Sequence, residues 1–296
     1  MRVVQLRRQS GPSGGHDAGM CRLVGWVSPA PTTLAALLGE PSLTELTELS
    51  RQHEDGWGLA WWDDGELRTV RSHEPAHASA QFRAVAQDVR ADAALLHLRW
   101  ATPGLAVAPD NTHPFVVGSW AFGHNGAVRP ADGLDALMPT GAHDLLRGDT
   151  DSERLLHVLA DRVRRHGFDE GLRATVSDVC RDLTPSSLNA LLLGRGDLTA
   201  VCCHGAPSLG DAPVLAGPPE DQPGYFDLCW RRQDDAVVVS SQPLGPSSWE
   251  RLANGSALVV QRGTARTREI SVGTFPPATL EREQRRRAQT AVPGAS

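Results

Sequence analysis

A methionine–cysteine pair, Met20 and Cys21, precedes the apolar segment 22–26 and is the first part of the chain that suggests chemistry. If Met20 began the working chain and were removed, Cys21 would carry both a thiol and a free α-amine. An α-amine has a pKa of about 7.7–8.0, so near neutral pH it could act as the base for the thiol of its own residue. The alternative is a small buried cysteine in a strand, which is more common for a lone Met-Cys pair. The rest of the chain must therefore supply the other parts of a site.

Four further segments carry side chains suited to binding or catalysis, and they are residues 97–104, 111–115, 123–126 and 148–153. In the first segment, Arg99 lies within an apolar strand, where burial is costly without an anionic partner. It is therefore either half of a structural ion pair or a clamp for a substrate carboxylate, because its planar fork suits two oxygens. In the second segment, His113 is expected to be a loop histidine with a supporting role.

The third and fourth segments each allow a structural and a functional interpretation. Asn125-Gly126 is typical of a hairpin turn, but the Asn125 amide and the Gly126 N–H could also form an oxyanion hole. Thr150 and Glu153 fit a capping box, in which Asp151 would simply favour the start of a helix. Alternatively, Asp151 faces a cavity and binds a substrate ammonium.

The composition excludes several classes of function. Hydrophobic residues make up 40% and charged residues 22% of the 296, which is ordinary for a globular protein, and the net charge of −6 offers no basic footprint for nucleic acid. No apolar run approaches the roughly 20 residues that span a bilayer. The five cysteines form no CxxC pair, so neither a zinc site nor a disulfide framework is indicated, and a cytoplasmic location is expected. The chain contains no lysine, which excludes a Walker phosphate loop, a lysine Schiff base and a pyridoxal enzyme.

The periodicity of apolar residues predicts the elements that position these segments. Strands are expected over residues 23–28, 59–62, 66–71, 93–99, 115–122, 188–193, 198–204, 226–231, 236–240 and 257–262, and helices over 32–39, 42–53, 78–90, 151–166 and 169–183. A turn at 63–65 makes the second and third strands a hairpin. Many short strands interrupted by paired helices favour an α+β fold with antiparallel sheets.

Three parts of the chain are expected. Residues 1–20 lack the hydrophobic stretch of a secretory signal and are expected to be a leader that is absent from or removed in the mature protein, although a retained flexible arm is the alternative. Residues 21–275 form one domain. Residues 276–296 form an exposed tail rich in Arg, Glu, Pro and Ala.

The motifs taken together, in this order, resemble the class II glutamine amidotransferases of the N-terminal nucleophile hydrolase superfamily. They are Cys21, His-x-Arg-Trp-Ala-Thr at 97–102, Asn-x-His-Pro-Phe at 111–115, Gly-His-Asn-Gly at 123–126 and Asp-x-Asp-Ser-Glu at 149–153. The chain looks most similar to stand-alone members that consist of the glutaminase domain only. The resemblance implies a four-layer αββα sandwich of two stacked antiparallel sheets. The segment 240–244 fits more loosely, because relatives often have Glu where Gln242 stands.

The resemblance also implies roles for individual residues. Cys21 would be the nucleophile, and Asn125 with Gly126 would form the oxyanion hole. Arg99 would hold the α-carboxylate of glutamine and Asp151 its α-ammonium. Trp100 and Thr102 would belong to the substrate site, and the residues that line or brace the pocket would be His53, Asp55, Gly56, Trp57, His113 and His124. No metal or organic cofactor is needed.

The implied reaction is cleavage of the side-chain amide of glutamine through a γ-glutamyl thioester, with release of ammonia. Because no residues remain for an acceptor domain, either a separate synthetase subunit takes the ammonia or water is the acceptor. One alternative is a hydrolase of larger γ-glutamyl conjugates, like the similar stand-alone proteins of ergothioneine synthesis. Another is a non-catalytic module of the same fold, which an unprocessed leader would favour. The sequence does not separate these possibilities.

Overall fold

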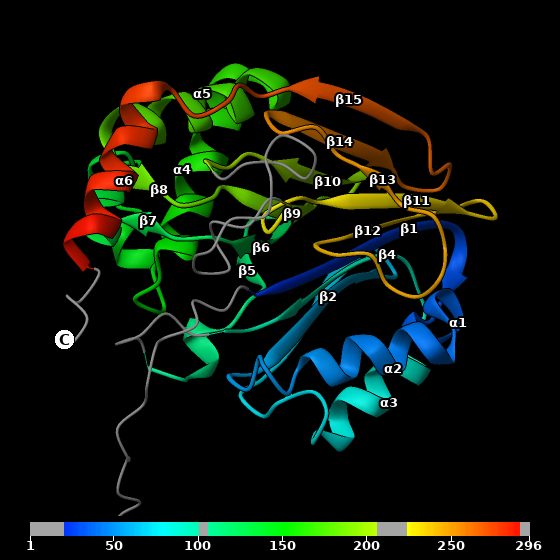
Figure 1. Ribbon diagram of the computed structural model, residues 1–296. Coiled ribbons are helices and arrows are strands. Elements are labelled where there is room, and N and C mark those ends of the chain that lie inside the picture. The colour runs from blue at the N-terminus through cyan, green and yellow to red at the C-terminus, as the bar shows by residue number, and fades with distance from the viewer. Residues whose placement is uncertain (1–20, 101–105, 206–223, 291–296) are drawn as a thin grey trace, which may run out of the picture.

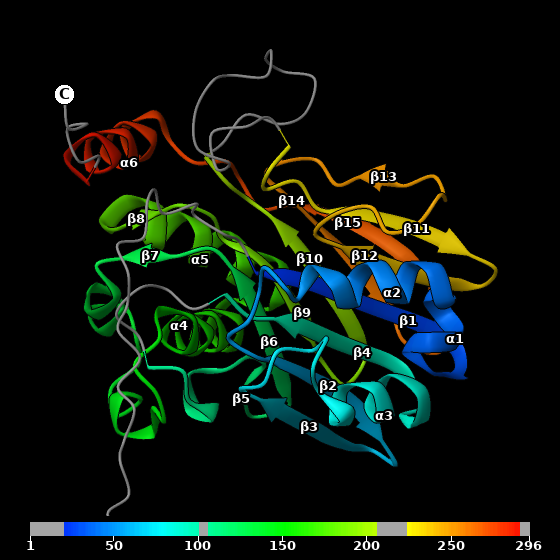
Figure 2. The same ribbon diagram turned by 60° about the horizontal axis from the view of Figure 1, so that its bottom comes forward.

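Two antiparallel sheets lie face to face in the computed structural model, which describes residues 21–100, 106–205 and 224–290 (Figure 1). Helices cover the outer face of each sheet, so the order of layers is helix, sheet, sheet, helix. Figure 2 shows α1 to α3 on one side of the stacked sheets and α4 and α5 on the other. The predicted α+β fold with two stacked antiparallel sheets is confirmed.

The first sheet contains the segment that follows Cys21. Its strand order is β13-β11-β12-β1-β4-β2-β3. These strands are β1 (Arg22–Thr32), β2 (Trp57–Asp63), β3 (Glu66–Ser72), β4 (Ala91–Leu98), β11 (Cys229–Gln233), β12 (Ala236–Ser240) and β13 (Glu250–Arg251). The helices that pack on its outer face are α1 (Leu34–Leu38), α2 (Glu40–Leu49) and α3 (Ala80–Asp88).

The second sheet contains the Gly-His-Asn-Gly motif. Its strand order is β15-β14-β10-β9-β6-β5, with β5 (Phe115–Val117), β6 (Trp120–Asn125), β9 (Asn189–Leu193), β10 (Asp197–Cys202), β14 (Ser256–Gln261) and β15 (Thr267–Ser271). Its outer face packs on α4 (Asp151–His166) and α5 (Phe168–Asp182). The smaller elements are a two-stranded sheet of β7 (Val128–Arg129) and β8 (Thr184–Pro185), and the 3-10 helices η1 (Pro109–Asn111), η2 (Ala131–Ala136) and η3 (His143–Leu145).

Both faces of the central strands are buried, which explains their continuous apolar sequences. In β1, Leu23 and Val27 face the other sheet, whereas Val24 and Trp26 face the helices. A strand buried on both faces has no polar side to alternate with, and burial of the apolar surface stabilises all four layers together. The sheets approach so closely at Gly25 that a Cβ there would lie 2.8 Å from a methyl group of Leu198.

The predicted elements agree with the structure except at a few places. The hairpin of β2 and β3 and the helix over residues 151–166 are confirmed. The single strand predicted over residues 115–122 is wrong, because Gly118 adopts a φ of +58° and turns the chain between β5 and β6. The edge strand β15 escaped prediction because most of its side chains are polar or charged.

The tail after residue 275 forms α6 (Pro277–Thr290), and part of it is packed rather than exposed. Thr279 and Glu283 are buried, and the Thr279 hydroxyl donates to the Cys180 carbonyl at 2.6 Å. The Arg282 guanidinium donates to the carbonyls of Cys180 and Leu183, so α6 satisfies groups at the end of α5. None of the helices in the described part of the chain has the length and hydropathy of a membrane span.

Candidate active site

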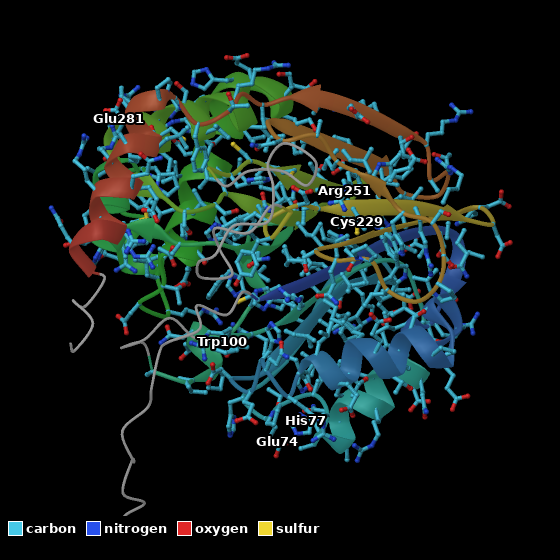
Figure 3. All side chains as sticks on the ribbon, in the orientation of Figure 1. Glu74, His77, Trp100, Cys229, Arg251 and Glu281 are labelled. Carbon is cyan, nitrogen blue, oxygen red and sulfur yellow. The ribbon has the colours of Figure 1, made fainter. Side chains whose placement is uncertain are left out.

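A pocket lies where β1, β4 and β6 of the two sheets approach the start of α4. The residues that line it are Cys21, Arg99, Trp100, Asn111, His113, His124, Gly126, Thr150, Asp151 and Ser152. Antiparallel pairing explains part of this set, because Arg22 at the start of β1 pairs with Leu98 at the end of β4. Cys21 therefore lies beside Arg99 and Trp100, although almost 80 residues separate them in the sequence. Figure 3 shows Trp100 near the start of β1.

The Cys21 thiol is held by the backbone of Trp100. The Trp100 N–H donates to Sγ at 3.3 Å, and the Trp100 carbonyl lies 3.4 Å from Sγ as an acceptor for the thiol hydrogen. Burial raises the pKa of Cys21 to about 11, although the Trp100 N–H and the charges of Arg99 and Arg22 favour the thiolate. The thiol is therefore protonated at neutral pH, and its hydrogen-bond partners among the described residues include no side-chain base.

The Arg99 side chain is buried and oriented by backbone groups. The two terminal nitrogens of the guanidinium donate to the carbonyls of Asp55 at 3.4 Å and Ala106 at 3.3 Å. The backbone N–H of Arg99 donates to the Gly56 carbonyl at 2.8 Å. Burial lowers the pKa of Arg99 and the Asp55 charge opposes this shift, but a guanidinium stays protonated at any ordinary pH. A fixed cation therefore lines the pocket beside the thiol.

Asp151 lies at the first position of α4 and also lines the pocket. Its Oδ2 accepts from the Val128 N–H at 2.6 Å, and Ser152 Oγ lies 3.4 Å from its Oδ1. Thr150 caps the start of α4 as predicted, because its hydroxyl accepts from the Glu153 N–H. The Glu153 carboxylate does not complete the predicted capping box, because it accepts from Arg147 and Gly148 N–H groups instead of Thr150.

Asn125 and Gly126 lie at the end of β6 rather than in a two-residue hairpin turn, since β6 pairs with β5 and β9. The Asn125 side-chain nitrogen is buried without a hydrogen-bond partner among the described residues. Such a donor costs free energy unless a ligand supplies the acceptor. Gly126 lines the pocket and has no space for a side chain, because a Cβ would lie 2.2 Å from the Ser187 carbonyl.

Three buried histidines lie behind these groups. His97 Nε2 donates to the His124 carbonyl at 3.2 Å, which links β4 of one sheet to β6 of the other, and the His97 ring stacks on His113 with centroids 4.0 Å apart. His124 Nε2 donates to the Ser187 carbonyl, so its Nδ1 is left to accept from the Ser152 hydroxyl, each at 3.0 Å. Burial lowers the pKa of His97 to about 3 and lowers the pKa values of His113 and His124, so the neutral rings are favoured.

Four of the remaining predicted residues, His53, Asp55, Gly56 and Trp57, are not among the residues that line the pocket. The rings of His53 and Trp100 meet in a T-shaped contact, with centroids 5.7 Å apart. The Asp55 and Gly56 carbonyls accept hydrogen bonds from Arg99, as described above. Glycine is required at position 56, because φ is +116° and a Cβ would lie 2.2 Å from the Ser72 carbonyl oxygen. Trp57 packs against Phe82 in the core between the first sheet and its helices. Thr102 lies outside the described residues.

Three lining residues were not among the predicted site residues, namely Asn111, Thr150 and Ser152. Each stands inside a motif already noted, but a neutral polar side chain in a loop or cap gives no signal that it faces a cavity. The loosely matching segment 240–244 also contributes, because the Ser241 hydroxyl and N–H both bond the backbone of Leu23 and hold the strand next to Cys21. The catalytic and binding roles of all these residues stay predictions.

Comparisons with known proteins show relatives over most of the chain. The chain is 28% identical over 220 residues to a gamma-glutamyl-hercynylcysteine sulfoxide hydrolase of Mycobacterium tuberculosis, which covers 71% of this chain and 89% of the relative. It is 27% identical over 257 residues to the Escherichia coli protein YafJ, which covers 80% of this chain and 95% of YafJ.

A solved structure and a family model agree with these similarities. A glutamine aminotransferase class-II domain protein from Silicibacter pomeroyi superposes with a TM-score of 0.57 at 19% identity, over 85% of this chain and all of that chain, which shows a shared fold. The model of the family described as "Glutamine amidotransferases class-II" matches residues 20–283. The chain therefore belongs to the class II glutamine amidotransferases.

Proposed function

We propose that the chain cleaves the side-chain amide of glutamine through a γ-glutamyl thioester on Cys21. The observation that carries this proposal is the surroundings of the thiol. Its partners among the described residues are backbone atoms of Trp100, burial raises its pKa to about 11, and an arginine and a carboxylate line the same pocket. A thiol in this position reacts only if a base is brought to it.

The α-amine of Cys21 is the base in this proposal. It becomes available when the peptide bond between Met20 and Cys21 is absent, and the family match that begins at Met20 supports this. With a pKa of about 7.7–8.0, the free amine accepts the thiol proton near neutral pH. The three buried histidines support the same choice, because burial disfavours the protonated form that a base must adopt, and none of their hydrogen bonds to described residues reaches Sγ.

The substrate is held by its amino-acid end. Arg99 binds the α-carboxylate through its fork and Asp151 binds the α-ammonium, so the γ-carboxamide is directed at Cys21. The thiolate attacks the amide carbon, and the oxygen that gains negative charge accepts from the Asn125 side-chain nitrogen and the Gly126 N–H. The buried Asn125 nitrogen, which bonds no described acceptor, supports this role.

The γ-glutamyl thioester then forms with loss of ammonia and is hydrolysed in a second step. The protonated α-amine returns its proton to the leaving nitrogen, and ammonia departs as the C–N bond breaks. A water molecule gives a proton to the same amine and attacks the thioester. The C–S bond breaks, the ammonium returns the proton to the departing sulfur, and glutamate leaves with the thiol restored. The ammonia goes to a partner synthetase or into solution.

A second candidate is hydrolysis of a larger γ-glutamyl conjugate, in which an amine leaves instead of ammonia. The name of the Mycobacterium tuberculosis relative favours it, at 28% identity. The γ-glutamyl half of such a substrate would use Arg99 and Asp151 in the same way. The two candidates differ in the leaving group alone, so an assay with both substrates separates them.

The test combines the mass of the mature N-terminus with two assays. Protein that begins at Cys21 is expected to release ammonia from L-glutamine and to be alkylated at Cys21 by a diazo-ketone analogue of glutamine. Protein that retains residues 1–20 is expected to do neither. Cys229 of β11, which lies far from Trp100 in Figure 3, serves as an internal control that stays unlabelled.

Each contrary result has a definite meaning. Activity with the leader retained would refute the α-amine as base. Release of an amine from γ-glutamyl conjugates with little ammonia from glutamine would favour the second candidate. A verified Cys21 terminus that is neither labelled nor active would indicate a non-catalytic module.

A further inference from the structure

Asn111 connects the two side chains that are proposed to hold the substrate's amino-acid end. It ends η1, is 4% exposed and lines the pocket. Its Nδ2 donates to the Ala106 carbonyl at 3.2 Å, which is the same oxygen that accepts from Arg99 at 3.3 Å. Its Oδ1 accepts from the Asp149 N–H at 2.9 Å, two residues before Asp151. The Asn111 side chain thus contacts both the carbonyl that holds Arg99 and the segment that leads into Asp151.

The packing around this contact leaves little freedom. Gly148 lies against Asn111, because a Cβ there would be 2.3 Å from Asn111 Oδ1. On the other side, the Arg71 guanidinium donates to the carbonyls of Pro109 and Thr112, which ties the loop to β3. The connection is therefore made between two segments that are themselves held in place.

A primary amide is needed to make both bonds. Its nitrogen donates and its oxygen accepts, whereas a carboxylate only accepts and an apolar side chain does neither. We propose that Asn111 is a positioning residue that sets the spacing between Arg99 and Asp151, and so selects ligands that carry a carboxylate and an ammonium on the same carbon. This inference rests on the proposed function of those two residues.

The proposal has a consequence for ligands that bind Arg99 and Asp151 together. A ligand with a carboxylate and an ammonium must meet Arg99 and Asp151 at once, so a change in their spacing weakens its binding. A ligand with one of these groups can follow whichever side chain it binds. Loss of Asn111 should therefore weaken the first kind of ligand far more than the second.

The experiment compares three competitive inhibitors of γ-glutamyl amide cleavage. L-glutamate carries both groups, glutarate lacks the α-ammonium, and 4-aminobutyrate lacks the α-carboxylate. Asn111→Ala is expected to raise the inhibition constant of L-glutamate about tenfold, and those of the other two less than about twofold. KM for L-glutamine should rise about tenfold and kcat should change less than about twofold.

Asn254→Ala is the matched control. The Asn254 side chain also accepts from a backbone N–H and donates to a backbone carbonyl, both of His204 and each at 3.0 Å, and it does not line the pocket. This variant loses bonds of the same kind and should leave all three inhibition constants unchanged. Melting temperatures of both variants, followed by circular dichroism, show whether each variant is folded at the temperature of the assay.

Two failures are distinguishable. If the wild-type enzyme is active but Asn111→Ala raises the three constants equally, or leaves the constant of L-glutamate unchanged, Asn111 is not a positioning residue and the proposed function stands. If the wild-type protein with a Cys21 terminus cleaves no γ-glutamyl amide and binds no L-glutamate, the proposed function fails and this inference fails with it.

Discussion

The Cys21 thiol shows how position and environment act on one residue in opposite directions. The N–H of Trp100 and the charges of Arg99 and Arg22 favour a thiolate, but the desolvation of a buried sulfur outweighs them. The same burial strengthens any interaction with a base placed beside the sulfur, because the local dielectric is low. In the proposed mechanism this thiol is inactive until its base is present, which would link activity to the state of the N-terminus.

Replacement of Cys21 by alanine should abolish turnover and preserve the fold. Cys21 as a whole residue is half-buried, and its thiol bonds only the backbone of Trp100 among the described residues, so the free energy of unfolding should change by less than about 1.5 kcal/mol. Ammonia release should fall by at least roughly a thousandfold. Both quantities are measured on the same preparation, and a melting temperature lowered by many degrees would mark Cys21 as a core residue instead.

Replacement of Arg99 by lysine should raise KM for glutamine by roughly tenfold or more, because an ammonium cannot present two parallel donors to a carboxylate. Lysine also cannot bond the Asp55 and Ala106 carbonyls with two separate nitrogens while it faces the substrate. Steady-state kinetics on the variant measures the effect. Unchanged KM and kcat would remove Arg99 from the site.

At the scale of elements, the site depends on how the end of β6 fits against its neighbours. His97 of β4 donates to the His124 carbonyl, and the Ser187 carbonyl accepts from His124 while it lies against Gly126. These contacts come from three segments and hold the Asn125–Gly126 backbone in one position. An oxyanion hole requires such rigidity, because its donors must be in place before charge develops.

Replacement of Gly126 by alanine should damage both stability and activity. The added Cβ would overlap the Ser187 carbonyl and lie 3.0 Å from His124 Nε2, so we expect the free energy of unfolding to fall by about 1–3 kcal/mol. Turnover should fall with it as the backbone shifts. Urea unfolding and ammonia release measure the two effects.

Gly196→Ala is the control for this change, because a Cβ at Gly196 meets nothing within 4 Å. It should leave turnover unchanged and alter the free energy of unfolding by less than about 0.5 kcal/mol. If Gly126→Ala were as active and stable as Gly196→Ala, the close packing described for Gly126 would be wrong.

At the scale of the whole molecule, four layers stabilise one another and bury histidines that would be protonated in water below about pH 6.5. His97 has a pKa of about 3 in the folded protein against 6.5 as an ordinary value, and the pKa values of His113 and His124 are lowered as well. The unfolded chain therefore binds more protons than the folded one below about pH 6.5. The stability that these neutral histidines contribute is fully present above that pH and is lost as the pH falls toward the folded-state values.

This linkage can be measured. Between pH 6 and pH 4, His97 should withdraw about 1.4 kcal/mol of unfolding free energy per pH unit once its unfolded form is fully protonated, because burial lowers its folded-state pKa to about 3. His97→Gln keeps a donor for the His124 carbonyl but does not titrate, so the slope of stability against pH should be smaller by that amount. Urea titrations at several pH values provide the slopes, and equal slopes in the two proteins would show that His97 is not buried as a neutral ring.

The sequence by itself determined most of the regular elements and the types of residue in the pocket. The hairpin at 63–65, the helix over 151–166 and the antiparallel α+β class follow from turn residues and apolar periodicity, which are local. The motifs with Cys21, Arg99 and Asp151 were recognisable from their residue types and from their order along the chain. Membership of the class II glutamine amidotransferases, inferred from those motifs, is confirmed.

Only the tertiary structure decided which of these residues meet. Asn125-Gly126 has the local signature of a hairpin turn, but β6 pairs with β9 and ends at Asn125, and the next residue, Gly126, lines the pocket. Asn111 carries no signal of its own, because the role proposed for it comes from contacts with Ala106 and Asp149, which lie in two different connecting segments. Trp57, which follows Gly56 in the chain, packs in the core between the first sheet and its helices. Contacts between residues far apart in the chain depend on the packing of all four layers at once, and no local pattern contains that information.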